Sequence, residues 1–217
     1  MKKIFHRLAP AVAISTALAL PGVASAAPEG NWVVKGTLTG IFPDKSSDGL
    51  NNISNSEIFL DEAASVGFSV TRRLDSHLGV GLYTAWPFYQ EVKGNDRLGR
   101  LGLHRLADVS QLPVGAAVTY HFMPNSTWRP YVGLDVDYAH FFDENNAFNG
   151  LNVSVDDAWG MGAQAGLDLN LNDRWLLTTS ARYVHMKTTA RLTGMIEQNV
   201  KMTLNPWFYS LGVGYRF

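Results

Sequence analysis

Large apolar side chains alternate with glycine and polar residues along this 217-residue chain, and this alternation constrains the fold more than any other feature. In segment 159–171 the odd positions are all apolar, with Trp159, Met161 and Leu167 among them, whereas the even positions hold Gly, Gln, Asp or Asn. Only an extended strand places successive side chains on opposite faces in this way. The pattern therefore predicts a β-strand with one apolar face and one small or polar face.

The same separation of faces recurs along the chain. It is found at 64–71, 78–84, 112–122 and 128–138, and we expect further strands at about 32–42, 175–187 and 201–217. Glycine, serine, threonine and charged side chains fill a dry core poorly, whereas large apolar side chains suit contact with lipid. A sheet edge in hydrocarbon would leave backbone groups unpaired, so the sheet has to close. We therefore predict a barrel whose apolar face points to lipid and whose polar face lines the lumen.

The lengths of the connections predict the number of strands. The links at 73–76, 123–127 and 172–174 are short, and those at about 43–60, 87–109, 143–157 and 189–200 are long. Transmembrane barrels of the outer membrane alternate short periplasmic turns with long outer loops. The links therefore predict an all-β fold, an eight-stranded antiparallel up-and-down transmembrane β-barrel with both ends in the periplasm.

The N-terminal segment has the pattern of a secretory signal. Basic residues at 2, 3 and 7 precede an apolar stretch, 8–20, and small residues suited to cleavage follow at 24–26. This order of charge, apolar stretch and small residues is typical of a signal peptide. We expect residues 1–26 to be a signal peptide cleaved after Ala26 and residues 27–217 to form the barrel domain. The predicted location is the bacterial outer membrane.

The composition excludes several other classes of protein. The chain has no cysteine, which excludes a structural disulfide and a thiolate metal site. Its formal net charge of −1 lacks the basic excess that a nucleic-acid-binding face needs. The sequence also contains no metal-ligand spacing and no Ser-His-acid motif. We therefore expect no catalytic residue, no metal, no cofactor and no nucleic-acid partner.

Aromatic residues are spaced as two girdles would require. Trp207 and Phe217 lie ten residues apart on one face of a strand, which at a tilt of ~40° corresponds to roughly 25 Å of membrane height. The terminal Phe217, preceded by Tyr215 and Val213, resembles the signal that the barrel-assembly machinery recognises. The predicted girdle residues are Trp32, Trp128, Trp159, Trp175, Trp207 and Phe217.

The same alternation assigns charged side chains to the lumen. Eight strands leave room for side chains or one small ligand rather than an open channel. Opposite charges in that space should pair, because an unpaired buried charge is costly. We expect a luminal charge plug toward the periplasm, and simple structural filling of the interior is a compatible alternative. The residues concerned are Lys35, Asp135, Asp137, Asp168, Arg182 and Arg216.

Apolar side chains face inward near the outer end of the predicted barrel. They could line a pocket for an apolar ligand, or they could form a dry packed plug beneath the loops. A ligand stopped by the charge plug would have to leave sideways into the membrane, where prolines such as Pro113 weaken strand pairing. The predicted ligand-lining residues are Ile41, Tyr83, Val184, Met186, Met202, Leu204 and Phe208.

Several segments of the C-terminal half resemble the OmpW family of outer membrane proteins. The resemblance is carried by WRPYVG at 128–133, DAWG at 157–160, LNPW at 204–207 and GVGYRF at 212–217. It covers most of residues 110–217, thins in the first half, and does not extend to the second outer loop. It implies an eight-stranded barrel that binds small hydrophobic molecules and passes them across the outer membrane.

Two other functions remain open at this point. A structural or receptor barrel, which could recognise colicins or lipopolysaccharide, would act through its loops. Arg97, Arg100, His104 and Arg105 of the second outer loop could contact lipopolysaccharide phosphates. A lipid A-modifying enzyme is the weaker alternative, because the histidines show no arrangement with a serine and an acid. The expected partners are outer-membrane lipid and lipopolysaccharide, a small hydrophobic ligand and the barrel-assembly machinery.

Overall fold

The computed structural model describes residues 31–43, 58–94, 105–146, 151–194 and 197–217. The predicted signal peptide lies outside these residues, as do Arg97, Arg100 and His104 and the side chain of Arg105. Within these ranges no helix is long and apolar enough to cross a membrane.

Strands make up nearly all of the described chain. Their order and bounds are β1 (Trp32–Phe42), β2 (Ile58–Leu60), β3 (Ala63–Arg73), β4 (Leu78–Ala85), β5 (Phe88–Gly94), β6 (Arg105–His121), β7 (Trp128–Asn146), β8 (Leu151–Val155), β9 (Ala158–Asn170), β10 (Trp175–Gly194), β11 (Gln198–Leu204) and β12 (Trp207–Arg216).

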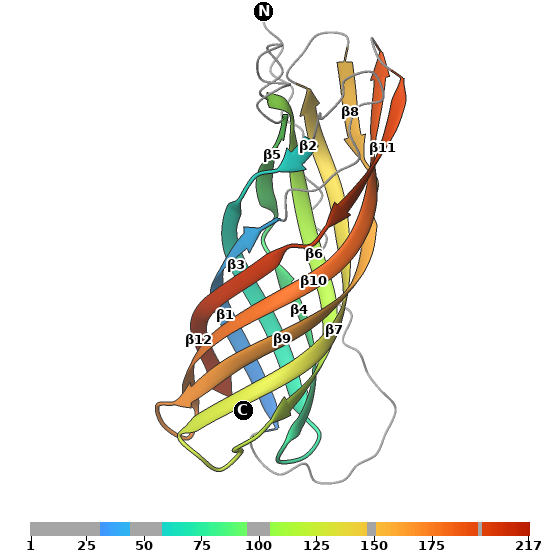
Figure 1. Cartoon of the computed structure of the whole chain (residues 1–217). Coiled ribbons are helices and arrows are strands. Elements are labelled where there is room, and N and C mark those ends of the chain that lie inside the picture. Colours follow the sequence, from blue (N-terminus) through green and yellow to red (C-terminus); the bar gives the residue numbers. More distant parts are fainter. Residues whose placement is uncertain (1–30, 44–57, 95–104, 147–150, 195–196) are drawn as a thin grey trace, which may run out of the picture.

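The strands form one closed antiparallel sheet (Figure 1). β1 pairs with β3 on one side and with β12 on the other, and the pairing of β6 with β7 completes the ring. The short strands β2, β5, β8 and β11 continue β3, β4, β9 and β12 toward the outer end. Counted in this way, the predicted closed eight-stranded antiparallel barrel is confirmed.

The outward face of the barrel is an apolar surface. Leu134, Met161 and Leu211 are 71%, 73% and 65% exposed. Their neighbours on the opposite face are small or polar, and Asp135 is buried in the lumen. Large apolar patches on the outside and charges on the inside are the arrangement that a lipid solvent requires.

Aromatic side chains lie at both ends of this apolar surface. Trp32, Trp128 and Trp175 begin β1, β7 and β10 at the lower end, and the Phe217 amide donates to the Trp32 carbonyl at 2.9 Å. At the outer end, Trp159 and Trp207 contact Tyr138 and Tyr183, with ring centroids 4.9 and 5.1 Å apart. All the predicted girdle residues are exposed to the outside. Amphipathic rings are favoured at membrane–water interfaces, which is why the sequence predicts girdles at these two levels.

The strands extend further beyond the membrane than the sequence pattern predicts. β10 runs to Gly194, and its outer part pairs with β8 and β11, so much of the expected links 143–157 and 189–200 is strand. Part of the expected link 87–109 is likewise strand, because β5 pairs with β6. Here the alternation is inverted: Leu192 and Val200 are buried inside, whereas Arg191 and Lys201 are exposed. Water surrounds this part, so the apolar face turns inward.

One periplasmic turn is held by a carboxylate. The backbone amides of Leu78 and His77 each donate to Asp75 Oδ1 at 2.7 Å. These two hydrogen bonds, that of Leu78 above all, lower the pKa of Asp75 because they stabilise its charged form. The turn joins β3 to β4 without needing a long loop.

Two glycines make room for tyrosine rings inside the barrel. Tyr83 lies opposite Gly115 in the β4–β6 pairing, and Tyr131 lies opposite Gly166 in the β7–β9 pairing. A Cβ atom on Gly115 would come within 2.3 Å of the Tyr83 ring, and one on Gly166 within 2.4 Å of the Tyr131 ring. Each ring therefore rests against bare backbone and fills space in the lumen.

We expect Gly166→Ala to lower the free energy of unfolding by about 1–3 kcal/mol, because the added methyl group forces Tyr131 out of its place. Gly36→Ala is the matched control, since a Cβ there has nothing within 4 Å. It should be neutral or slightly stabilising, because alanine restricts the unfolded chain. Urea unfolding of the barrel in lipid vesicles, followed by tryptophan fluorescence, measures both variants. Equal losses for the two would contradict the assigned contact.

Candidate functional site

The lumen contains three layers of side chains, which we call the lower charged layer, the middle charged layer and the upper apolar layer. Strand register sets their order from the periplasmic to the outer end. Each layer collects residues from strands that are far apart in the sequence, because every second residue of each strand points inward.

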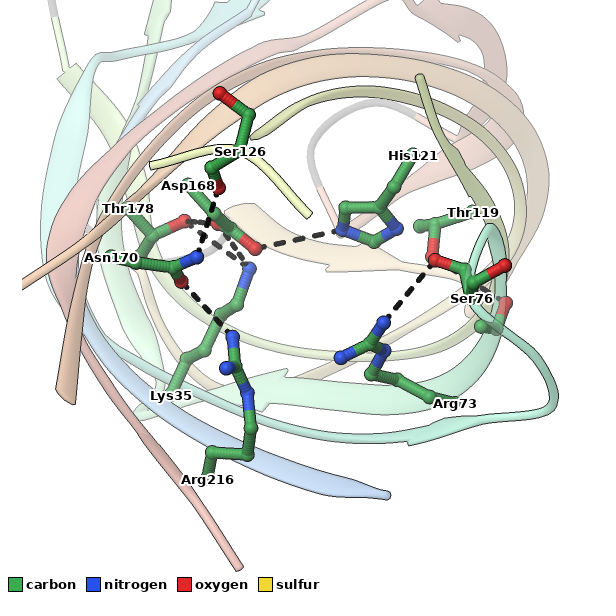
Figure 2. A network of polar contacts seen from close by, with 11 residues as sticks. Lys35, Arg73, Ser76, Thr119, His121, Ser126, Asp168, Asn170, Thr178 and Arg216 are labelled. Atoms are coloured by element: carbon green, nitrogen blue, oxygen red, sulfur yellow. Dashed lines mark hydrogen bonds and ion pairs between the residues drawn. The ribbon is translucent and has the colours of Figure 1, made fainter. Parts of the chain in front are cut away.

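The lower charged layer is centred on Asp168 of β9. Lys35 Nζ lies 2.6 Å from Asp168 Oδ1, and the Thr178 hydroxyl donates to the same oxygen at 2.7 Å. His121 Nε2 lies 3.6 Å from the other oxygen, Oδ2. Figure 2 shows these side chains converging from the barrel wall. The carboxylate is almost completely buried, with 4% of its side chain exposed, and is well supplied with donors.

Three arginines surround this layer. Arg216 Nη2 donates to Asn170 Oδ1 at 3.0 Å, and Arg73 Nη2 donates to the Ser76 carbonyl at 3.2 Å. Arg129, opposite Asp168 in the β7–β9 register, is only 1% exposed. Lys35, Asp168 and Arg216 from the predicted charge plug therefore lie in this layer.

The middle charged layer holds the remaining predicted plug residues. Arg182 Nη1 lies 3.4 Å from Asp137 Oδ1, and the Tyr83 hydroxyl donates to that oxygen at 2.8 Å. The Gln164 amide donates to Asp135 Oδ1 at 3.3 Å. The Arg182 guanidinium also lies over the Tyr83 ring, 4.2 Å from its centroid.

The upper apolar layer is a packed cluster of buried side chains. Its members from the predicted ligand-lining set are Ile41, Val184, Met186, Met202, Leu204 and Phe208, each with at most 4% exposed. Tyr83 differs from the expectation, because its hydroxyl binds Asp137 and places it in the middle charged layer. Alternation assigns a side chain to the lumen but does not determine which layer its polar end joins.

A cavity of about 130 Å³ lies in the lumen. It reaches from Arg73 and Arg129 at the lower end to Phe88 and Phe208 at the upper end, with threonine and serine side chains between them. Of the predicted ligand-lining residues, Tyr83 and Phe208 border this cavity, whereas the other five are not part of its wall. The cavity therefore lies below most of the upper apolar layer.

Strand pairing is interrupted beside this cavity. The β4–β6 pairing ends at Thr84 and Val114, and the β5–β6 pairing resumes at Phe88 and Gln111 with the register displaced by one residue. Pro113 lies within the interruption on β6, at the position where the sequence suggested weaker pairing.

Pro87, on the opposite side of the interruption, is a residue that our sequence reasoning did not single out. It lies between β4 and β5, and like Pro113 it has no N–H to donate to a neighbouring strand. Pro87 breaks the alternating pattern directly after Trp86, and this break was the sequence feature from which the interruption could have been predicted. Ala85, Phe88 and Pro113 all line the cavity, so the interruption adjoins the luminal space.

The described histidines lie in different parts of the barrel, and His77 Nδ1 lies 2.9 Å from the Ser76 hydroxyl in an exposed periplasmic turn. His121 lies in the lower charged layer, whereas His140 and His185 are exposed on the outside and bind Asp157 and Asn205. The described residues contain no group of three or more His, Cys, Asp or Glu side chains that could hold a metal ion.

A lipid-facing apolar surface, aromatic residues at two levels and a charged lumen within eight strands define a small outer-membrane β-barrel protein. The model of the OmpW family matches residues 28–217, and the chain belongs to this family. The predicted family and the predicted location in the outer membrane are both confirmed.

Named relatives and solved structures agree with this membership. Outer membrane protein W of Vibrio cholerae is 32% identical over 197 residues, which cover 87% of this chain and 89% of the relative. The crystal structure of OprG from Pseudomonas aeruginosa is similar with a TM-score of 0.78 and 30% identity, covering 87% of this chain and 96% of OprG. The structure of AlkL in lipid bilayers has a TM-score of 0.69 at 23% identity, covers 91% and 94% of the two chains, and supports the fold.

We expect Asp168→Asn to lower the free energy of unfolding by about 3–5 kcal/mol, because it leaves Lys35 buried without its counter-charge. Adding Lys35→Met should restore much of the loss, since the charge is then absent. Arg191→Gln is the control: it removes an exposed pair with Asp156 at 2.8 Å and should change stability by about 0–1 kcal/mol. Urea unfolding in vesicles measures all of these variants. A double variant as unstable as Asp168→Asn would contradict a pairing role.

Proposed function

We propose that this barrel binds small hydrophobic molecules at its outer end and releases them sideways into the outer membrane. The observation that carries the proposal is the interruption of strand pairing beside the luminal cavity, at Pro87 and Pro113. An apolar ligand that entered from outside would meet apolar side chains first, and this interruption lies near the lower border of the upper apolar layer.

The two charged layers oppose straight passage to the periplasm. Lys35, Asp168 and Arg182 are paired and largely buried below the upper apolar layer. Binding of an apolar molecule in the charged layers is unfavourable, because it would break hydrogen bonds that it cannot replace. The lowest-cost direction for such a molecule is toward hydrocarbon.

The wall beside the interruption supports a sideways route. Phe68 and Leu82 are 51% and 55% exposed on the lipid face and also border the cavity. Ala85 and Phe88 border it from within. Apolar residues therefore lie on both the luminal side and the lipid side of the wall at this part of the barrel, where the pairing of β4 and β5 with β6 is interrupted.

The names of two relatives support the choice of ligand class. Dibenzothiophene metabolism operon protein PahQ of Pseudomonas aeruginosa is 26% identical over 114 residues, which cover 52% of this chain and 54% of PahQ. DoxH of a Pseudomonas strain has the same identity and coverage. Dibenzothiophene is an apolar aromatic compound, so these names connect related barrels with a hydrophobic molecule.

We expect Leu204→Asp to reduce uptake of an apolar fluorescent probe by about tenfold, because a carboxylate in the upper apolar layer makes the entry of an apolar molecule unfavourable. Lys201→Asp, on the outer face of the same strand, is the matched control and should retain uptake. Cells expressing each variant are compared for initial uptake rate, after heat-modifiability on gels has shown that the barrel is folded. Unchanged uptake by Leu204→Asp counts against this entry site.

A disulfide beside the interruption tests the sideways exit. Thr84 and Val114 are directly paired and face outward, and the absence of native cysteine gives a clean background. We expect oxidised Thr84→Cys/Val114→Cys to lower uptake several-fold and reductant to restore it, because the cross-link prevents the strands from separating. Leu78→Cys/Tyr120→Cys joins the same two strands far from the interruption and should have no effect. Equal uptake by the oxidised and reduced forms of the first pair would argue for another exit.

A further inference from the structure

We propose that the periplasmic end of the lumen binds a small oxyanion, a carboxylate or a phosphate group, through Arg129 together with Arg73 and Arg216. This inference goes beyond the proposed uptake of apolar molecules and does not depend on it. It rests on the unpartnered Nε and Nη2 of the buried Arg129 guanidinium, on the two neighbouring arginines, and on a cavity that Arg73 and Arg129 line.

Arg129 is the central observation. The residue is 1% exposed, and Nε and Nη2 are buried with no hydrogen-bond partner among the described residues. These two atoms carry three of the five N–H donors of the guanidinium. A buried charged donor without a hydrogen-bond acceptor costs free energy. The unpartnered donors of Arg129 therefore point to an acceptor that comes from outside the chain.

The nearest carboxylate in the strand register is already engaged. Asp168 lies opposite Arg129 across β7 and β9, but its Oδ1 is bound by Lys35 and Thr178. Its other oxygen, Oδ2, lies 3.6 Å from His121. Asp168 therefore balances Lys35 and leaves the charge of Arg129 without a direct partner.

Arg73 and Arg216 add positive charge to the same region. Figure 2 shows both side chains extending into the lumen from different parts of the wall. Their described hydrogen bonds go to uncharged oxygens, those of Ser76, Asn170 and Asp173, the last through its backbone carbonyl. Arg216 Nε has no partner among the described residues.

The charges of these three arginines act on one another. Arg73 and Arg216 both repel the charge of Arg129, which Asp168 attracts without a direct contact, and Arg216 also repels the charge of Arg73, which Asp75 attracts. In the described residues, none of the three forms an ion pair with a carboxylate within 4.0 Å. A bound anion would relieve this repulsion and supply the missing acceptors at once.

The cavity gives such an anion a place to bind. Arg73 and Arg129 both line it, together with the hydroxyl-bearing side chains of Thr71 and Thr119. The whole cavity measures about 130 Å³, and these side chains line its lower end. The planar fork of an arginine matches the oxygens of a carboxylate or phosphate group, which selects oxyanions over chloride.

Thermal unfolding at constant ionic strength tests the proposal. The refolded mature barrel in detergent is titrated with sodium phosphate, with sodium hexanoate or with sodium chloride, and the Tm is measured. We expect phosphate, hexanoate or both to raise the Tm saturably by several degrees above chloride, because a ligand that binds only the folded state stabilises it. A rise with phosphate alone assigns the site to phosphate, and a rise with hexanoate alone assigns it to carboxylates.

Arg129→Gln should abolish this rise, whereas Arg72→Gln should retain it. Arg72 is a suitable control because it is exposed on the outer face, where its guanidinium lies over the Trp32 ring. If Arg129→Gln does not fold, Arg73→Gln serves the same comparison. A Tm that responds to the oxyanions no more than to chloride, or an equal rise in the lumen variant and in Arg72→Gln, overturns the proposal. Neither result depends on uptake of apolar molecules.

Discussion

Backbone hydrogen bonding in hydrocarbon is the constraint on which the rest of this structure depends. Each N–H and C=O group within the membrane must find a partner in the protein, so the sheet closes and β1 meets both β3 and β12. Closure separates the two faces of every strand into a lipid side and a luminal side. The narrow lumen then has to accommodate whatever side chains alternate inward, including charges and large rings.

The membrane-spanning part of the fold could be predicted from the sequence, because the alternation of apolar and polar residues shows which face of a strand contacts lipid and which faces the lumen. Leu134 and Asp135 are neighbours on opposite faces, and the structure places one toward lipid and the other in the lumen. Beyond the membrane the same rule fails, because Leu192 turns inward where water surrounds the strands. The luminal contacts were harder to predict from the sequence. No local pattern shows that the Tyr83 hydroxyl reaches Asp137, or that Pro87 and Pro113 lie at the same interruption of strand pairing.

The lumen combines two chemistries that favour different ligands. Its outer end offers apolar contacts to a molecule that dissolves poorly in water, whereas its periplasmic end presents guanidinium groups with unsatisfied donors. Between them, the pair of Arg182 and Asp137 forms a polar boundary. The two ends of the lumen are therefore chemically different environments, and the strand pairing is interrupted at Pro113 beside the cavity.

The inverted alternation above the membrane has a consequence for biogenesis. The outer parts of β10 and β11 carry Arg191 and Lys201 on one face and Leu192 and Val200 on the other. Such amphipathic hairpins cannot rest in hydrocarbon, so they must cross the bilayer before their apolar sides can meet. The apolar contacts at the cell-surface end, those of Leu192 and Val200, can therefore form only after these segments have crossed the bilayer.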